Sequence, residues 1–234
     1  MARLTAIMTR PTGSNSAFLD RIADDVRACI DVIESPLIAI VPLAVDIQID
    51  PQHAVIFTSS NAVRLAPDGE GRRAYCVGEG TQQSALTKGW DAQVMGRDAD
   101  EFVSNMADVV INNPLHHLSG VHVRGNIAQR LRDLGKTVLH TAIYDQQKCR
   151  WTEAAETALL GTELVLVSLF SPRTAEQFAA LSRPRPDLSI VAISAAVSDA
   201  LPSEWQECVT VSSAPTASSM AEAFEIRARK LCLA

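Results

Sequence analysis

Short hydroxyl and amide side chains follow an apolar run in the stretch "VIFTSSNAVRL" (55–65). The run ends in Thr58, Ser59, Ser60 and Asn61, and no acid, histidine or cysteine lies beside them. A similar stretch, "LVLVSLFSPRTAEQF" (164–178), occurs in the C-terminal half of the chain. Side chains of these types hold ligands by hydrogen bonds, but they offer no paired nucleophile and base.

Polar turns of this kind recur five times, each where a parallel strand is expected to end and a helix to begin. They are Ser59-Ser60-Asn61, Gly78-Glu79-Gly80-Thr81, Arg124-Gly125-Asn126, Ser171-Pro172-Arg173-Thr174 and Ser194. Open α/β sheets bind ligands outside the carboxyl ends of their strands. Helix N-termini there carry free N–H groups, which suit carboxylates and phosphates. N-capping alone explains any single turn, but five turns in two similar halves favour a polar ligand site.

The order of elements around these turns is repeated. After "VIFTSSNAVRL" come "AYCVGEGTQQSAL" (74–86) and "AQVMGRDADEFVSNM" (92–106). After "VLVSLFSPRTAEQF" come "IVAISAAVSDAL" (190–201) and "CVTVSSAPTASSMAEAF" (208–224). Alternation of apolar strands with helical segments indicates parallel sheets with right-handed crossovers. The repeat therefore predicts two similar α/β domains of flavodoxin-like type.

Two extended segments fit neither half of the repeat. They are "ESPLIAIVPLA" (34–44) and "KTVLHTAIYDQQ" (136–147). Because they flank the first repeat, we expect them to form a two-stranded linker at residues 35–42 and 139–147. One domain is then continuous over residues 43–138, and the other combines residues 1–34 with 148–234.

Composition narrows the classes of function. The chain has 234 residues and a formal net charge of −6, without a Lys/Arg run, which argues against binding to nucleic acid or to an acidic membrane. No apolar run is long enough for a membrane span or a secretion signal, so a cytoplasmic protein is expected. The five cysteines lack metal-like spacing and are predicted to be reduced thiols, mostly small core residues: Cys29, Cys76, Cys149, Cys208 and Cys232.

The remaining polar residues give few signals for catalysis. "VGEGTQQSAL" (77–86) lacks the third glycine of a dinucleotide fingerprint, and the chain has no P-loop or H-E-x-x-H motif. His116 and His117 are predicted to lie in a solvated loop, and His122, His140 and Tyr75 to be structural strand residues. Tyr144 is the exception. It lies in an extended segment where a tyrosine can offer an apolar face and a hydroxyl donor; a half-buried strand tyrosine is the alternative.

An ordered set of motifs resembles the uroporphyrinogen-III synthases over nearly the whole chain. The motifs are "TRP" (9–11), "SPLIAIVP" (35–42), "IFTSSNAV" (56–63), "YCVGEGT" (75–81), "VRGN" (123–126), "RLRDLG" (130–135), "AIYDQQ" (142–147), "FSPRTAEQF" (170–178) and "AISAAVSDAL" (192–201). The resemblance implies two α/β domains joined by a two-stranded linker, an active site in the cleft between them, and neither cofactor nor metal.

The resemblance also implies a reaction. Linear hydroxymethylbilane, the small-molecule substrate, is cyclised to uroporphyrinogen III with inversion of ring D and loss of water, on the route to haem. Loss of the ring A hydroxyl gives an azafulvene, and ring D then attacks to form a spiro intermediate that fragments and recloses. Transient contact with the preceding bilane-forming enzyme is left open. A two-domain small-anion binding or sensory module without catalysis is the alternative function.

Several residues acquire roles from the resemblance. Tyr144 matches the tyrosine that assists departure of the hydroxyl, and Thr81 matches a threonine of the cleft. The expected substrate-binding residues are Arg10, Ser59, Ser60, Asn61, Gly78, Arg124, Gly125, Asn126, Ser171 and Ser194, among which the roles of Arg10 and Arg124 in pairing carboxylates are our own inference. The family often has "IGPTTA" where this chain has "ISAAVS" (193–198). Whether Ser194 and Ser198 replace the missing hydroxyls is therefore open.

Overall fold

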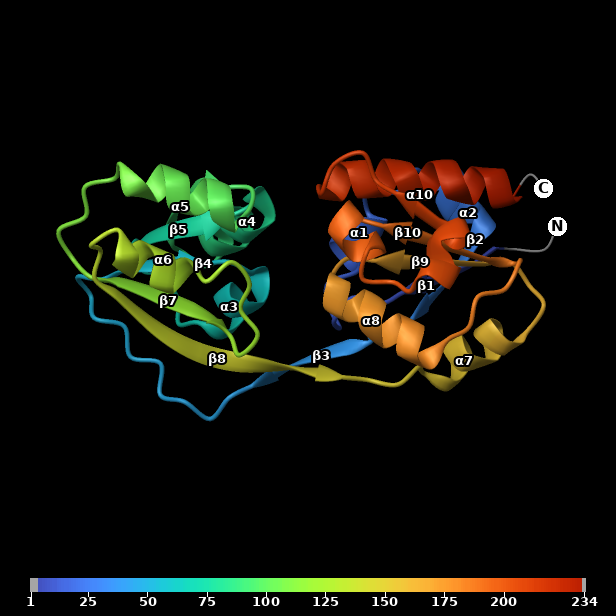
Figure 1. Ribbon diagram of the computed structural model, residues 1–234, viewed down its shortest axis with the longest axis horizontal. Helices are drawn as coiled ribbons and strands as arrows, with labels where there is room; N and C mark the ends of the chain where they lie inside the picture. The colour runs from blue at the N-terminus through green and yellow to red at the C-terminus, as the bar shows by residue number, and fades with distance from the viewer. Residues whose placement is uncertain (1–3, 233–234) are drawn as a thin grey trace. The chain divides into compact units, whose positions relative to one another are not determined.

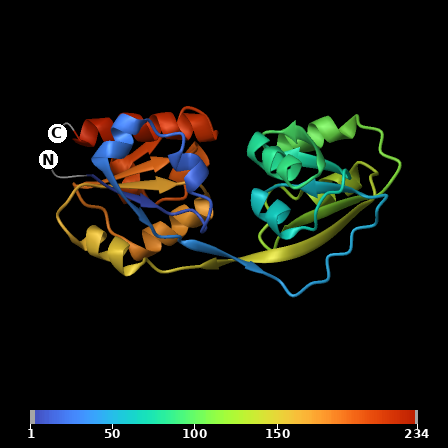
Figure 2. The same cartoon turned by 180° about the vertical axis from the view of Figure 1, so that it is seen from behind.

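The computed structural model describes residues 4–232, which fold into two compact α/β units (Figures 1 and 2). Unit 1 combines the chain up to Ala39 with the chain from Gln147 onward, and unit 2 is Ile40–Gln146. The chain passes from one unit to the other through β3 (Ile38–Pro42) and returns through β8 (Val138–Lys148). The prediction of two α/β units with parallel sheets is confirmed. Within residues 4–232, no helix combines the length and the apolar character needed to cross a bilayer.

Unit 1 is built on a sheet in which every strand pairs parallel to its neighbours. In spatial order the strands are β11 (Val209–Val211), β10 (Leu188–Ala192), β9 (Val165–Leu169), β1 (Leu4–Met8) and β2 (Ile30–Glu34). Strands β1, β9 and β10 are buried along their whole length. Such strands read as continuous apolar runs because helices cover both faces of the sheet.

Helices cover the two faces of unit 1 in two separate apolar clusters. One face packs against α1 (Ser16–Leu19), α2 (Asp24–Cys29) and α10 (Ala217–Cys232). The other packs against α7 (Glu153–Leu160), α8 (Pro172–Leu181), α9 (Ala195–Ser198) and the short 3-10 helix η1 (Ser203–Cys208). Phe178 anchors the second cluster, with its ring 4.7 Å from that of Trp205 and 5.9 Å from that of Trp151.

Unit 2 contains five parallel strands and one further strand at the sheet edge. In spatial order they are β3, β8, β7 (Leu115–Gly120), β4 (Ala54–Phe57), β5 (Arg73–Val77) and β6 (Asp91–Gly96). Helices α3 (Ser60–Leu65) and α4 (Glu79–Thr87) pack on one face, and α5 (Ala99–Ala107) and α6 (Ile127–Asp133) on the other. Strand β3 runs antiparallel to β8. The backbone N–H of Leu43 donates to the carbonyl of Ile143, and the N–H of Cys149 donates to the carbonyl of Leu37.

Each sheet reverses its winding direction at one place. Numbered by order of appearance within unit 1, the strands lie in the order 2-1-3-4-5, so the reversal falls between β1 and β9. The five parallel strands of unit 2 lie in the order 3-2-1-4-5, so the reversal falls between β4 and β7. Doubly wound sheets form a ligand crevice outside the carboxyl ends of the strands at such switch points. The topology therefore indicates two candidate ligand sites, one at the switch point of each unit.

The prediction that His116 and His117 lie in a solvated loop is wrong. Both belong to β7, which pairs with β4 on one side and β8 on the other, and both are buried. His116 Nε2 lies 2.8 Å from the hydroxyl of Thr141. The His117 ring stacks on His140 at 5.1 Å, and neither of its nitrogens has a hydrogen-bond partner. Burial, together with the nearby His140, lowers the pKa of His117 to about 3.

We expect His117 to make the protein sensitive to acid. Its unfolded pKa is about 6.5, so from there down to about 3 the unfolded chain binds a proton that the folded chain does not. The free energy of unfolding therefore falls as the pH drops through this window. Urea titrations at pH 7 and about pH 4.5 should show that His117→Leu reduces the acid-induced loss of stability by about 2–3 kcal/mol.

The exposed His122, which pairs with Asp145 at 3.3 Å, provides the control. His122→Gln removes one histidine from the same unit without emptying the core, so it should keep the wild-type dependence on acid. Equal losses of stability in the wild type and in His117→Leu would show that His117 is not held neutral.

Candidate active site

The switch point of unit 1 carries a cation without a counter-charge. Arg10 follows β1, Phe170 follows β9, and the Arg10 guanidinium lies 4.7 Å from the centroid of the Phe170 ring. Burial lowers the pKa of Arg10, and no described residue forms an ion pair with it. A partly buried charge that lacks a partner favours the arrival of an opposite one. This edge is therefore suited to a carboxylate.

Ser171, which follows Phe170, fixes the start of α8 beside this cation. Its Oγ accepts the N–H of Thr174 at 3.1 Å and lies 2.8 Å from the Thr174 hydroxyl, while Pro172 opens the helix. The positive end of the α8 dipole consequently lies at the same sheet edge as Arg10. Ser194 precedes α9 but makes no side-chain cap. Ser198 is buried and donates to Gln206 Oε1 at 3.2 Å, which gives it a structural role.

The switch point of unit 2 holds Tyr144. Its hydroxyl makes hydrogen bonds with the Ser59 side chain and with the Gly120 backbone, and only 4% of the residue is exposed. The ring lies directly on Gly120, where an added Cβ would be 2.7 Å from Tyr144 Cε2. A register shift between Ser119 and Gly120 aligns Gly120 with Tyr144, as bulges do when they re-aim a side chain. Burial raises the pKa of the Tyr144 phenol, so the hydroxyl is protonated at neutral pH.

The turn after β4 serves two purposes. Ser59 contacts Tyr144, and it also caps α3 by accepting the N–H of Asn61 at 3.1 Å. Ser60 is exposed, and the Asn61 side chain accepts a 3.4 Å hydrogen bond from Arg64. The structure thus brings Ser59 and Tyr144 together. Tyr144 is more deeply buried than the half-buried strand tyrosine that was the alternative prediction. The role of its hydroxyl in the reaction stays a prediction.

The remaining predicted residues of unit 2 lie after the neighbouring strand ends. Gly78 directly precedes α4 and has a φ of 77°, a conformation that favours glycine. Its N–H donates to the carbonyl of Gly96 at 2.8 Å. Thr81, in the first turn of α4, is 8% exposed, and its hydroxyl forms no hydrogen bond within residues 4–232. Arg124, Gly125 and Asn126 form an exposed loop after β7. Gly125 has a φ of 72° and lies so close to Ala99 that a Cβ would be 2.3 Å away.

Two residues of the site were not predicted from the sequence. Gly120 could have been suspected, because a glycine that ends an apolar strand often marks a bulge or a close approach. Phe170 gave no such signal, since its contact with Arg10 joins segments far apart in the chain. Within the described part of the chain, no three His, Cys, Asp or Glu side chains are grouped to hold a metal ion. The donors are a guanidinium and a helix N-terminus at the switch point of unit 1, and a phenol and hydroxyls at that of unit 2. Groups of these types are suited to binding anions and to donating hydrogen bonds.

These features define a two-unit, doubly wound α/β protein with polar and cationic groups at its switch points. The family described as uroporphyrinogen-III synthase HemD matches residues 26–222. The chain belongs to the uroporphyrinogen-III synthase family, as the ordered motifs indicate.

Solved structures support the same fold. The chain is similar to a uroporphyrinogen-III synthetase from Helicobacter pylori, with 15% identity, a TM-score of 0.63, and coverage of 94% of this chain and 97% of that one. It is also similar to a mutant uroporphyrinogen III synthase from Thermus thermophilus, with 13% identity, a TM-score of 0.52, and coverage of 97% and 99%. At these identities the likeness establishes the fold alone. Among curated protein sequences, none matches this chain.

Gly120→Ala should displace Tyr144, because the new methyl group would collide with its ring. We expect a loss of about 1–3 kcal/mol in the free energy of unfolding, as overpacked sites show. In a Tyr75→Phe background, where Tyr144 is the remaining tyrosine, its phenol pKa should move down toward about 10 as the ring becomes more exposed. Urea denaturation and tyrosine absorbance titrations measure the two effects.

Gly80→Ala is the matched control. Gly80 lies in α4 at the same edge, and a Cβ there would meet nothing within 4 Å. Alanine should leave stability unchanged or raise it by up to about 1 kcal/mol. If both variants were equally stable, Gly120 would not be needed for the position of the tyrosine.

Proposed function

We propose that this chain cyclises hydroxymethylbilane to uroporphyrinogen III chiefly by holding the substrate and assisting departure of the ring A hydroxyl. Family membership supports the reaction. The observation that carries the residue assignment is the buried Tyr144 hydroxyl, held by Ser59 and Gly120 at the unit 2 switch point. Because the linear substrate also closes without an enzyme, to the wrong isomer, catalysis needs control of conformation more than a strong nucleophile.

The substrate is a polyanion with acetate and propionate groups on its pyrroles. The net charge of −6 means that attraction to it must come from local donors. We propose that Arg10 and the start of α8 at Ser171 bind substrate carboxylates in unit 1. In unit 2 we assign carboxylate binding to the turns at Ser59-Ser60-Asn61, Gly78 and Arg124-Gly125-Asn126, with Ser194 as a further contact in unit 1. Thr81 would orient the substrate beside the Gly78 turn.

The phenol of Tyr144 is suited to donating a hydrogen bond rather than releasing a proton. Burial raises its pKa, and its contacts with Ser59 and Gly120 offset part of that rise. The phenol proton is then available to the departing ring A hydroxyl, while burial keeps the pKa high overall. Electron donation from the pyrrole nitrogen supplies the rest of the driving force for water loss. We further propose that the enzyme works in the cytoplasm and receives its substrate through transient contact with the bilane-forming enzyme.

Tyr144→Phe tests the assignment of the phenol. The substrate is generated in situ, and the type I and type III isomers are separated after oxidation. Single-turnover formation of type III should fall about ten- to a hundredfold, at the lower end of the usual range for general acids, while spontaneous type I increases. Tyr75→Phe, on β5, should behave as wild type.

Two outcomes of this experiment would contradict different parts of the proposal. Wild-type protein that produced type I alone would sink the synthase function and leave an anion-binding module. A Tyr144→Phe variant with the wild-type rate would leave the function standing and make the tyrosine structural.

Arg10→Gln tests the carboxylate site of unit 1. Loss of a charge-assisted contact should raise KM about tenfold, equivalent to about 1.4 kcal/mol, with a smaller change in kcat. Arg21→Gln removes the same charge from an exposed position of unit 1 and should leave KM unchanged. Equal effects from the two variants would mean that Arg10 acts only through the overall charge.

A further inference from the structure

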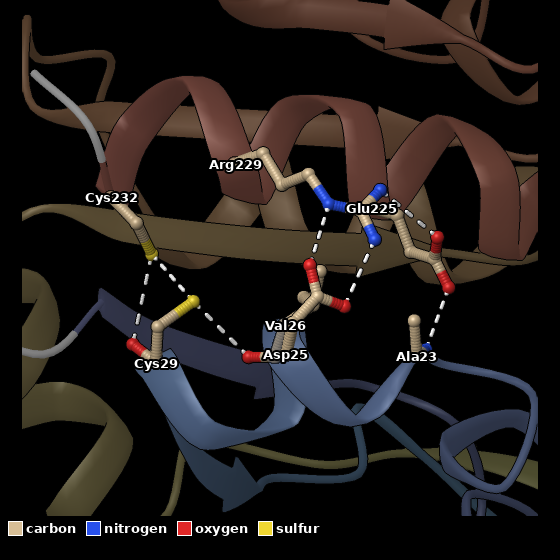
Figure 3. Close-up of polar contacts among 7 residues, drawn as sticks. All are labelled: Ala23, Asp25, Val26, Cys29, Glu225, Arg229 and Cys232. Atoms are coloured by element: carbon tan, nitrogen blue, oxygen red, sulfur yellow. Dashed lines mark hydrogen bonds and ion pairs between the residues drawn. The ribbon is translucent and has the colours of Figure 1, made fainter.

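Two cysteines from opposite ends of the chain meet in unit 1. Cys29 ends α2 and Cys232 ends α10, and their sulfur atoms lie 2.9 Å apart (Figure 3). Both thiols are free and half-buried, so a small oxidant can reach them. The S–S distance in a disulfide is about 2.05 Å. The two sulfur atoms therefore need to approach each other by less than about 1 Å to reach this distance. The prediction that most of the cysteines are small core residues is wrong, because Cys76 alone among the five is buried.

Polar contacts hold α2 against α10 along its length. Arg229 binds both carboxylate oxygens of Asp25 at 3.0 Å and pairs with Glu225 at 3.2 Å. Glu225 in turn accepts the N–H of Ala23 at 2.7 Å, just before α2 begins (Figure 3). We call these four residues the α2–α10 clamp. Because the clamp fixes one side of the helix pair, the thiols at its other end stay close together.

Hydrogen bonds also orient the two sulfur atoms. Cys29 Sγ donates to the carbonyl of Val26 at 3.2 Å, and Cys232 Sγ donates toward Cys29 Sγ. Burial and the neighbouring Cys29 raise the pKa of Cys232 to about 11, so Cys232 is rarely a thiolate at neutral pH. Because the Cys29 sulfur accepts the S–H of Cys232 at 2.9 Å, we take Cys29 as the residue oxidised first and Cys232 as the residue that resolves it.

We propose that Cys29 and Cys232 are a reversible modification site, forming an intramolecular disulfide when the protein meets a hydroperoxide. Cys29 sulfur attacks the terminal peroxide oxygen, breaking the O–O bond and giving a sulfenic acid and water or an alcohol. Cys232 sulfur then attacks the Cys29 sulfur and expels the sulfenic oxygen as a second water. Two thiols lose two electrons and two protons in total, and a dithiol reductant restores them.

The cross-link would tie the N-terminal part of unit 1 to its C-terminal helix. The two residues are 203 positions apart, and the closed loop includes the whole of unit 2. In the chain-entropy account, longer loops restrict the unfolded state more strongly. The oxidised protein should therefore resist unfolding better than the reduced protein.

The test treats fully reduced protein with one equivalent of hydrogen peroxide, blocks remaining thiols, and compares intact mass, non-reducing peptide maps and Tm. We expect a loss of about 2 Da before blocking, from two hydrogens, and a cross-linked peptide pair containing Cys29 and Cys232. The Tm should rise by about 5–10 °C and return after dithiothreitol. Cys149→Ser, which removes a thiol that no other sulfur contacts, should behave as wild type.

Two further variants separate the pair from general oxidation. Cys232→Ser should leave Cys29 as a sulfenic acid, trapped by dimedone, without a rise in Tm. Arg229→Met should slow cross-linking several-fold while giving the same product. The proposal is overturned if wild-type Cys29 is oxidised to sulfinic acid without a cross-link, if the disulfide joins two molecules, or if another cysteine pair forms.

Discussion

The parallel pairing of β1 with β9 and of β4 with β7 determines where this protein can act. The carboxyl ends of parallel strands all lie at the same sheet edge, so the turns that follow the strands gather there. The reversal of winding then opens that edge at a single place in each unit. Arg10, Phe170 and Ser171 are close together because of the first reversal. Ser59, Gly120 and Tyr144 meet because of the second.

Each edge combines polar groups with burial, which is partial at Arg10 and nearly complete at Tyr144. A phenol in the core of unit 2 keeps its proton, and the guanidinium against Phe170 forms no ion pair within residues 4–232. A partly buried charge of this kind makes an incoming anionic group more favourable. In the proposed function, these two groups of residues hold a polyanion without the basic surface that would bring nonspecific partners. The overall negative charge is consistent with such selectivity.

Local sequence was sufficient for most of the elements, the repeat and most of the strand-end turns, since each depends on residues near one another in the chain. Contacts that depend on register were not predictable. The bulge after Ser119 aligns Gly120 with Tyr144, and nothing in either segment specifies that pairing. Likewise, Arg10 meets Phe170 and Cys29 meets Cys232 only once the sheet order is known. His116 and His117 were assigned to a loop because Asn112, Asn113 and Pro114, which are typical turn residues, precede them and polar residues usually continue a loop.

The discontinuity of unit 1 has a consequence for biosynthesis. Strands β1 and β2 leave the ribosome first, but β1 needs β9 as its second neighbour, and β9 is made only after the whole of unit 2. Because domains fold as units during synthesis, unit 2 can complete its sheet while the apolar β1 still lacks a partner. For that interval the nascent chain exposes an unpaired strand edge, which is the feature most prone to aggregation. The exposure of this edge lasts through the later half of translation, until β9 has been made.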